Sequence, residues 1–151
     1  MRKSFLAACV AGVAGLASSV ALAQMKPEVM VKQRQAVMTL QGKYFGPMVG
    51  MMQGKVPFNL QVVQRNAGFL DNLSRMPWDG FDASTKDVKS AALPAIWSDG
   101  AKFAEAADRL QSEANKLYQV SRGGDEAAIK AQIKAVGGAC GGCHEHFRAK
   151  Q

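Results

Sequence analysis

The sequence of 151 residues has little cysteine, histidine and proline, with three, two and five of them respectively. One cysteine, Cys9, lies in the apolar N-terminal stretch, so the rest of the chain has no basis for a disulfide framework. We find no stretch in which apolar and polar residues alternate, which argues against a β-sheet protein. No arginine cluster with interleaved aromatic residues is present, so we do not expect nucleic acid as a partner. No paired carboxylates lie near the two C-terminal cysteines, and neither histidine is spare for acid–base chemistry, so we expect no enzymatic activity.

Residues 1–23 have the features of a cleaved export signal. Two basic residues, Arg2 and Lys3, precede an apolar run, and residues 21–23 have the small-x-small pattern Ala-Leu-Ala. The run is short for a membrane span and contains glycine and serine, so we expect no retained membrane anchor. Residues 24–151 would then form one domain of 128 residues. Loss of the two basic residues lowers the net charge from +7 to +5, which suits good solubility or an acidic partner.

The most informative motif is Cys-Gly-Gly-Cys-His at residues 140–144, because C-x-x-C-H is typical of covalent haem attachment. Each thiol can add to one haem vinyl group, and the adjacent imidazole can bind the iron. Residues three and four apart share a helix face, so Cys140, Cys143 and His144 would project toward one flat ligand. Arg148 would lie on the same side, where haem propionates need a cationic partner. The motif therefore predicts one haem c bound through two thioethers, with His144 as proximal ligand.

Three other interpretations of the cysteine pair are less consistent with the sequence. A redox dithiol would follow a strand in a βαβ unit, and no such unit is visible. Cys140, Cys143, His144 and His146 could supply four zinc ligands, but zinc folds place their second ligand pair at a distance. A disulfide between Cys140 and Cys143 would be strained on a helix. His146 would point away from His144 and is expected to be exposed.

Apolar periodicity predicts four amphipathic helices in the mature chain, at about 27–52, 59–76, 94–121 and 125–147. Pro27 suits the start of the first helix, and Gly46-Pro47 should kink it. We expect Asn59 to cap the second helix and Gly123-Gly124 to end the third. The irregular segment 77–92 contains Trp78 and Phe81, which should turn inward. We therefore predict an all-α fold, an up-down-up-down four-helix bundle with covalently bound haem.

Several short segments along the mature chain resemble one family, the class II c-type cytochromes, which comprise cytochrome c-prime and its low-spin relatives of the c-556 type. The position of C-x-x-C-H is the most specific feature, because only seven residues follow His144. The other matching segments are Lys26-Pro27-Glu28, Arg34-Gln35, Gly54-Lys55-Val56-Pro57-Phe58, Pro77-Trp78 and Ile96-Trp97.

This resemblance implies a left-handed four-helix bundle over residues 24–151, commonly a homodimer, in the periplasm of a Gram-negative bacterium. It matches Cys140 and Cys143 to the thioether cysteines and His144 to the proximal iron ligand. Arg148 matches an arginine near the proximal haem face.

The resemblance also carries over residues outside the motif. Arg34 matches a propionate-binding arginine, Gln35 a neighbouring haem contact, and Met38 the residue that faces the distal side of the iron. Trp78 and Phe81 match aromatic residues of the haem pocket. Arg34 and Met38 share a helix face, which agrees with both of them facing the haem.

Two functions remain at this point, and Met38 decides between them. In the first, His144 and Met38 both bind the iron, and the protein carries electrons between redox partner proteins. In the second, the distal site is open and captures nitric oxide or carbon monoxide. We expect ligation by Met38 and electron transfer, with gas binding as the alternative.

Overall fold

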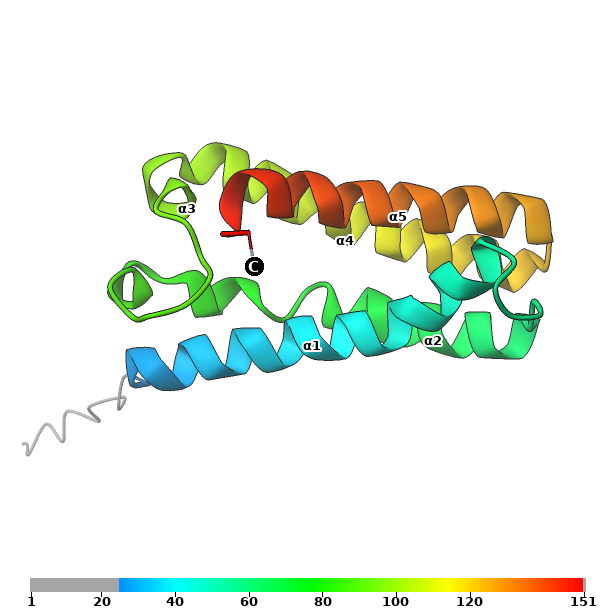
Figure 1. Cartoon of the computed structure of the whole chain (residues 1–151), viewed down its shortest axis with the longest axis horizontal. Helices are drawn as coiled ribbons and strands as arrows, with labels where there is room; N and C mark the ends of the chain where they lie inside the picture. The colour runs from blue at the N-terminus through cyan, green and yellow to red at the C-terminus, as the bar shows by residue number, and fades with distance from the viewer. Residues whose placement is uncertain (1–24, 151) are drawn as a thin grey trace, which may run out of the picture.

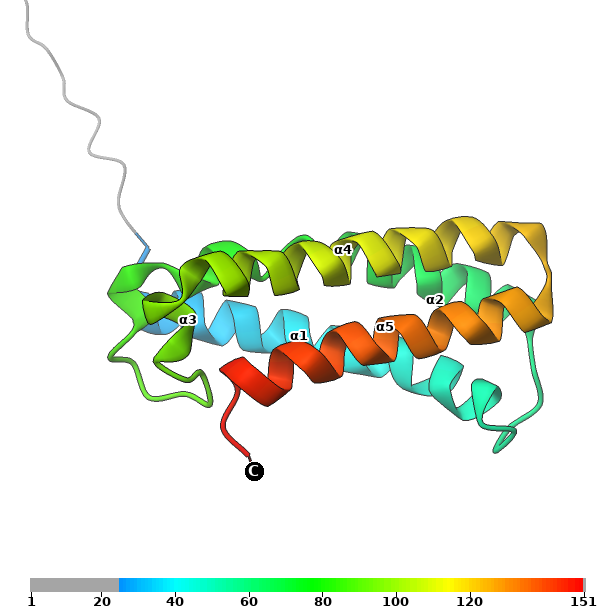
Figure 2. The same ribbon diagram turned by 90° about the horizontal axis from the view of Figure 1, so that it is seen from above.

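The computed structural model describes residues 25–150, so the predicted export signal lies outside the described residues. Four long helices run side by side, each antiparallel to the one before it (Figures 1 and 2). They are α1 (Pro27–Met52), α2 (Leu60–Leu73), α4 (Gly100–Gly123) and α5 (Glu126–Phe147). The predicted all-α fold and the up-down-up-down arrangement are confirmed. Between residues 25 and 150, the one isolated β-bridge joins Ala92 to Arg148.

The ends of the helices follow from local sequence. α1 begins at Pro27. The first N–H groups of a helix have no partner within the helix, so a proline, which has no N–H, is well suited to this position. The side chain of Asn59 accepts a hydrogen bond of 3.1 Å from the Val62 N–H and caps α2, as predicted. α4 ends at Gly123, and the next residue, Gly124, caps it with a left-handed φ of 77°. The side chain of Asp125 then accepts from two backbone N–H groups in the first turn of α5.

The predicted continuous helix over residues 94–121 is wrong, because Asp99 leaves helical geometry with φ −128° and ψ 54°. A four-residue helix, α3 (Ala95–Ser98), precedes the break and α4 follows it. The break allows α3 to pack on its own: Ile96 is buried, and Trp97 Nε1 donates a hydrogen bond of 2.9 Å to Phe81 O. The seven-residue step from Ile96 to Phe103 is also compatible with one continuous helix, so the periodicity alone does not reveal the break.

The segment between α2 and α3 is less irregular than predicted. It contains two short 3₁₀ helices, η1 (Trp78–Phe81) and η2 (Ala83–Thr85). α2 also ends at Leu73, three residues before the predicted end, and Ser74 follows it with its hydroxyl donating to Asp71 O at 2.7 Å.

The hydrophobic core lies where α4, α5 and α2 meet the second half of α1. Its fully buried members are Met48, Val63, Ala67, Leu70, Ala114, Leu117, Ile129, Ile133 and Val136. α5 packs mainly on α4 and far less on α1. α1 and α5 meet at Gly137, where an added Cβ would lie 3.8 Å from the Phe45 ring. None of the helices between residues 25 and 150 is long and apolar enough to cross a membrane.

Replacing Asn59 with alanine should remove the side-chain cap of α2 and lower the free energy of unfolding by about 1 kcal/mol. Urea unfolding of the holoprotein, followed by far-UV circular dichroism, measures this loss. Gln61→Ala is a matched control, since Gln61 is exposed in the first turn of the same helix. Equal stability of the two variants would show that the cap contributes nothing.

Candidate functional site

A cavity of about 630 Å³ lies between the first half of α1, the C-terminal end of α5 and the segment containing η1. Its volume is within the range of ~300–1,000 Å³ that is usual for sites binding small molecules and cofactors. All nine residues that the sequence singled out line this one cavity: Arg34, Gln35, Met38, Trp78, Phe81, Cys140, Cys143, His144 and Arg148. The structure therefore brings together residues that are more than 100 positions apart in the chain.

The shape of the cavity follows from the way α5 is packed. The Phe45 ring of α1 packs over Gly137 of α5 and fills the space between the two helices there, at a distance of 3.8 Å from the position of an added Cβ. One helical turn further along α5, Cys140 already lines the cavity. The remaining turns of α5 present Cys143 and His144 to the same space, as the spacing of the motif predicts.

The environment of the motif keeps its side chains neutral. Burial and the neighbouring Cys143 raise the pKa of Cys140 to about 11, and burial also raises the pKa of Cys143. Burial and the charge of Arg148 lower the pKa of His144. A neutral imidazole is the form that binds metals. A thioether is uncharged, so burying it in the cavity carries no cost of removing a charge from water. The site therefore suits an imidazole ligand and two thioether bonds.

The structure does not support the alternative interpretations of the cysteine pair. Cys140 and Cys143 are both free, so they form no disulfide. No group of three or more His, Cys, Asp or Glu side chains within residues 25–150 is arranged to hold a metal ion. The motif lies on a helix that follows another helix, so the βαβ context of a redox dithiol is also absent from this part of the chain.

Arg34 has more protein partners than the sequence suggested. Its side chain is buried, with 3% of the residue exposed, and burial lowers its pKa. Nη1 donates hydrogen bonds to Gly80 O and, at 2.9 Å, to Thr85 Oγ1. Nη2 donates to Ser90 Oγ at 3.1 Å, and the guanidinium lies 4.3 Å from the centre of the Phe81 ring. These contacts lie 46 to 56 residues away in the chain, and periodicity gives no signal for them.

Four aromatic rings form one wall of the cavity. Phe103 contacts Trp78, Phe81 and Phe147 edge-on, with ring centroids 4.9–5.8 Å apart. Phe103 and Phe147 both line the cavity, and neither is among the nine site residues that the sequence singled out. Phe147 lies four residues after Cys143, and that spacing could have identified it as a pocket residue.

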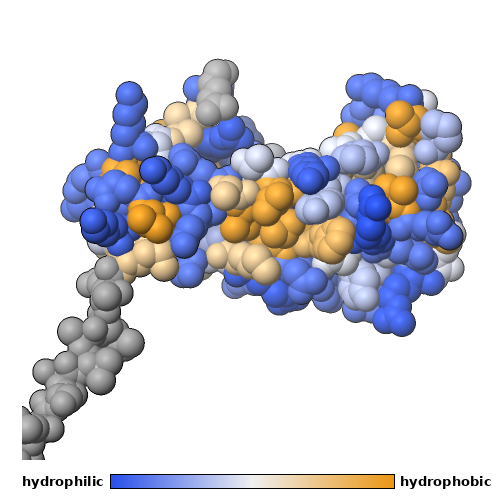
Figure 3. All heavy atoms as spheres, turned by 90° about the horizontal axis from the view of Figure 1, so that it is seen from below, coloured by the Kyte–Doolittle hydropathy of each residue, from blue (hydrophilic) through white to orange (hydrophobic). Residues whose placement is uncertain are grey.

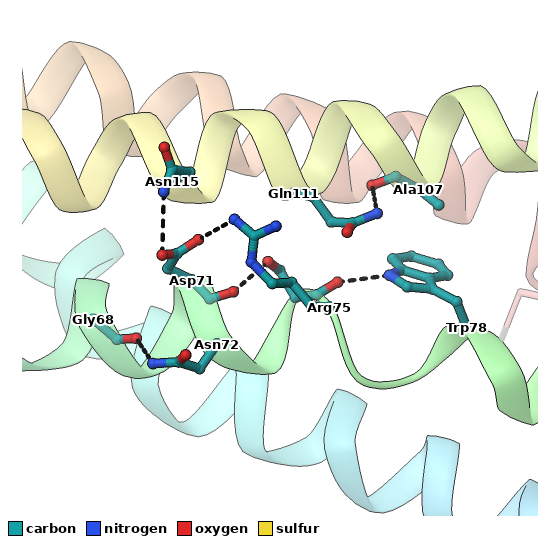
Figure 4. Close-up of polar contacts among 9 residues, drawn as sticks. Gly68, Asp71, Asn72, Arg75, Trp78, Ala107, Gln111 and Asn115 are labelled. Atoms are coloured by element: carbon teal, nitrogen blue, oxygen red, sulfur yellow. Dashed lines mark hydrogen bonds and ion pairs between the residues drawn. The ribbon is translucent and has the colours of Figure 1, made fainter.

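Trp78 connects this wall to the contact between α2 and α4 (Figure 4). Its indole Nε1 donates a hydrogen bond of 2.7 Å to Ser74 O at the end of α2. Asp71, one turn earlier, accepts hydrogen bonds from Arg75 at 3.0 Å and from Asn115 of α4 at 3.2 Å. These bonds join α2 to α4 and hold the start of η1 in place.

Met38 provides the one thioether on the α1 side of the cavity. It is half-buried and one turn after Arg34. Apart from the motif itself, no other methionine, histidine or cysteine within residues 25–150 lines this cavity. His146 is exposed and outside the cavity, as predicted.

Comparison with known proteins gives the site its context. The family model of cytochrome c' matches residues 29–148. This chain belongs to the cytochrome c' family. It is therefore a monohaem c-type cytochrome that binds haem c covalently, with cysteines 140 and 143 at the expected positions.

Named relatives cover nearly the same length. Cytochrome c' of Rubrivivax gelatinosus is 40% identical over 126 residues, which cover 83% of this chain and 98% of the relative. A ferrous variant of the Alcaligenes xylosoxidans protein with bound NO has a TM-score of 0.78 at 33% identity, covering 83% of this chain and 98% of that one. A carbon monoxide-bound variant of the same protein has a TM-score of 0.77 at 34% identity, with the same coverage.

Replacing Cys140 and Cys143 together with alanine should abolish covalent attachment, because no thiol would remain in residues 24–151 to form a thioether. Haem staining of a denaturing gel should show no stained band for the double variant. Zinc content, measured by elemental analysis, should be negligible in the wild-type protein. A stained band in the double variant would contradict the thioether assignment.

Proposed function

We propose that this cytochrome is an exported electron carrier, with His144 binding the haem iron from α5 and Met38 binding it from α1. The observation that supports this proposal is that Met38 and His144 line one cavity from two different helices. Haem c supplies an iron that gains or loses a single electron. A His/Met ligand pair raises its reduction potential and suits it to electron transfer.

The other cavity residues have roles that follow from their chemistry. Cys140 and Cys143 tether the cofactor to the last turns of α5, where it cannot dissociate. Arg34 and Arg148 place two cations on the cavity wall, where they can pair with the propionates. The rings of Trp78 and Phe81 exclude water from the iron, and the amide of Gln35 offers a hydrogen bond near the cofactor.

Binding of nitric oxide or carbon monoxide is a second candidate function. The observation that favours it is that structures of Alcaligenes xylosoxidans cytochrome c' with these gases share the fold of this chain. In this case Met38 would crowd the distal side without binding the iron, and its apolar surface would disfavour polar ligands.

Replacing Met38 with alanine separates the two candidates. If Met38 binds the iron, the reduced wild-type protein has a sharp α band and resists carbon monoxide, and Met38→Ala is high-spin and binds the gas. Absorption spectra before and after carbon monoxide addition measure both properties. Met30→Ala is the control, because Met30 lies on α1 outside the cavity. A wild-type protein that is already high-spin and binds carbon monoxide rapidly would favour the gas-binding function instead.

A homodimer through α1 and α2 is part of the same proposal. The face on which these two helices lie has a central apolar patch (Figure 3). Val29 and Leu40 of α1 and Phe69 of α2 are 39–43% exposed, and the Phe69 ring lies 4.7 Å from that of Tyr44. A patch of this kind is often covered by a partner. The net charge of +5 without the signal would favour an acidic protein as the redox partner of such a dimer.

Replacing Leu40 with glutamate should weaken the dimer at least tenfold, because it places a charge in the apolar patch. Sedimentation velocity of the holoprotein over a range of concentrations measures the dissociation constant. Val56→Glu is the control, since Val56 is 46% exposed in the loop after α1. A wild-type protein that sediments as a monomer would refute the dimer.

A further inference from the structure

Residues 90–93, here called the strap, cross one edge of the cavity between α1 and the end of α5. Ala149 N–H donates a hydrogen bond of 2.8 Å to Ala91 O, and Leu93 N–H donates one of 3.0 Å to Phe147 O. Three residues of the strap, at positions 90–92, line the cavity. The strap is therefore bonded to the residues that directly follow the haem-binding motif.

The other end of the strap is held by α1. Arg34 donates a hydrogen bond to Ser90 Oγ, and the same guanidinium donates to Gly80 O and Thr85 Oγ1. Thr85 is fully buried, and its hydroxyl lies 2.7 Å from Asp82 O, so the acceptor for Arg34 is itself held in place. One side chain thus joins three points of the segment 80–90 to the first helix.

The segment lies directly on the backbone of α1 at this point. A Cβ built on Gly80 would be 2.8 Å from Arg34 Cβ, which is closer than real Cβ contacts allow, and 3.1 Å from Met30 O, which is tighter than most of them. Glycine at position 80 therefore permits the contact, and Arg34 stabilises it. A lysine could not replace the arginine here, because its single ammonium group cannot reach three acceptors in a fixed planar arrangement.

Arg34 also keeps donors available for the cofactor. A guanidinium has five N–H groups, and the three hydrogen bonds to Gly80, Thr85 and Ser90 use three of them. Two N–H groups remain for a propionate, so the contacts with the segment and a contact with the haem edge are compatible.

We infer that Arg34 is a positioning residue that anchors the segment 80–93 to α1. Through the strap, this anchor sets the separation between Met38 on α1 and His144 on α5. Met38 lies one helical turn from Arg34, and the strap is bonded to Phe147, three residues after His144. The effect on Met38 rests on the proposed function, whereas the anchor itself does not.

Arg34→Lys tests the anchor because it keeps the positive charge and removes the planar set of donors. Hydrogen–deuterium exchange of the holoprotein should show at least tenfold faster exchange for the hydrogen-bonded amides of Thr85, Leu93 and Ala149. Lys32→Gln is the charge control, since Lys32 is exposed on the same helix, and its exchange in this region should match the wild type. Wild-type exchange in Arg34→Lys would mean that Arg34 is only a counter-charge for the propionates, and would overturn the anchor.

Thr85→Val is the second variant, because Thr85 does not line the cavity and valine has a similar shape. It should speed exchange of the same amides about threefold, and it replaces Arg34→Lys in the test if that variant fails to fold. If Arg34→Lys does not fold and the amides of Thr85→Val exchange at the wild-type rate, the anchor is overturned.

The carbon monoxide association rate of the ferrous protein should rise in both variants, since a looser strap lets Met38 withdraw from the iron. If Met38 does not bind the iron in the wild-type protein, no rise in the association rate is expected. The exchange experiment alone then tests the anchor. Faster exchange with an unchanged association rate, in a wild type that does have Met38 ligation, would overturn the link from Arg34 to Met38.

Discussion

The whole site depends on the packing of α5, which must cover the core on one side and present the haem-binding motif on the other. Four glycines at positions 137, 138, 141 and 142 each disfavour a helix by ~1 kcal/mol relative to alanine. The helix nevertheless continues to Phe147, because Ala139 and Phe147 are buried on either side of the motif and anchor it by packing. Gly138, Gly141 and Gly142 are exposed, whereas Cys140, Cys143 and His144 line the cavity on another face of the same helix.

The buried guanidinium of Arg34 is the main electrostatic feature of the cavity wall. Its partners between residues 25 and 150 are a carbonyl, two hydroxyls and an aromatic ring, and none of them is a carboxylate. These dipoles accept three of its five N–H groups without neutralising its charge, so a positive potential remains in the cavity. In the proposed electron carrier, that potential would attract propionates and would stabilise the reduced form of the haem relative to the oxidised form. Arg34 would then contribute to redox tuning as well as to structure.

Local chemistry and local spacing account for what the sequence could predict. The motif at 140–144, the cap at Asn59 and the left-handed Gly124 each depend on a few neighbouring residues, and all are found as expected. The cavity residues on α1 came from resemblance to a family, because a lone arginine or methionine on a helix has no distinctive signal. The break at Asp99, the partners of Arg34 and the strap could not be predicted, since each arises from contacts between segments far apart in the chain.

In the proposed function, the position of Met38 relative to the iron would depend on two contacts of α1, one on either side of this residue. Toward the N-terminus, Arg34 joins α1 to the strap and so to the end of α5. Toward the C-terminus, Phe45 packs against α5 at Gly137. The part of α1 that carries Met38 is thus held at both ends, and the reach of its thioether depends on those contacts as much as on the residue itself. A larger side chain at position 137, or a shorter one at position 34, would change the separation of the helices while Met38 stayed the same.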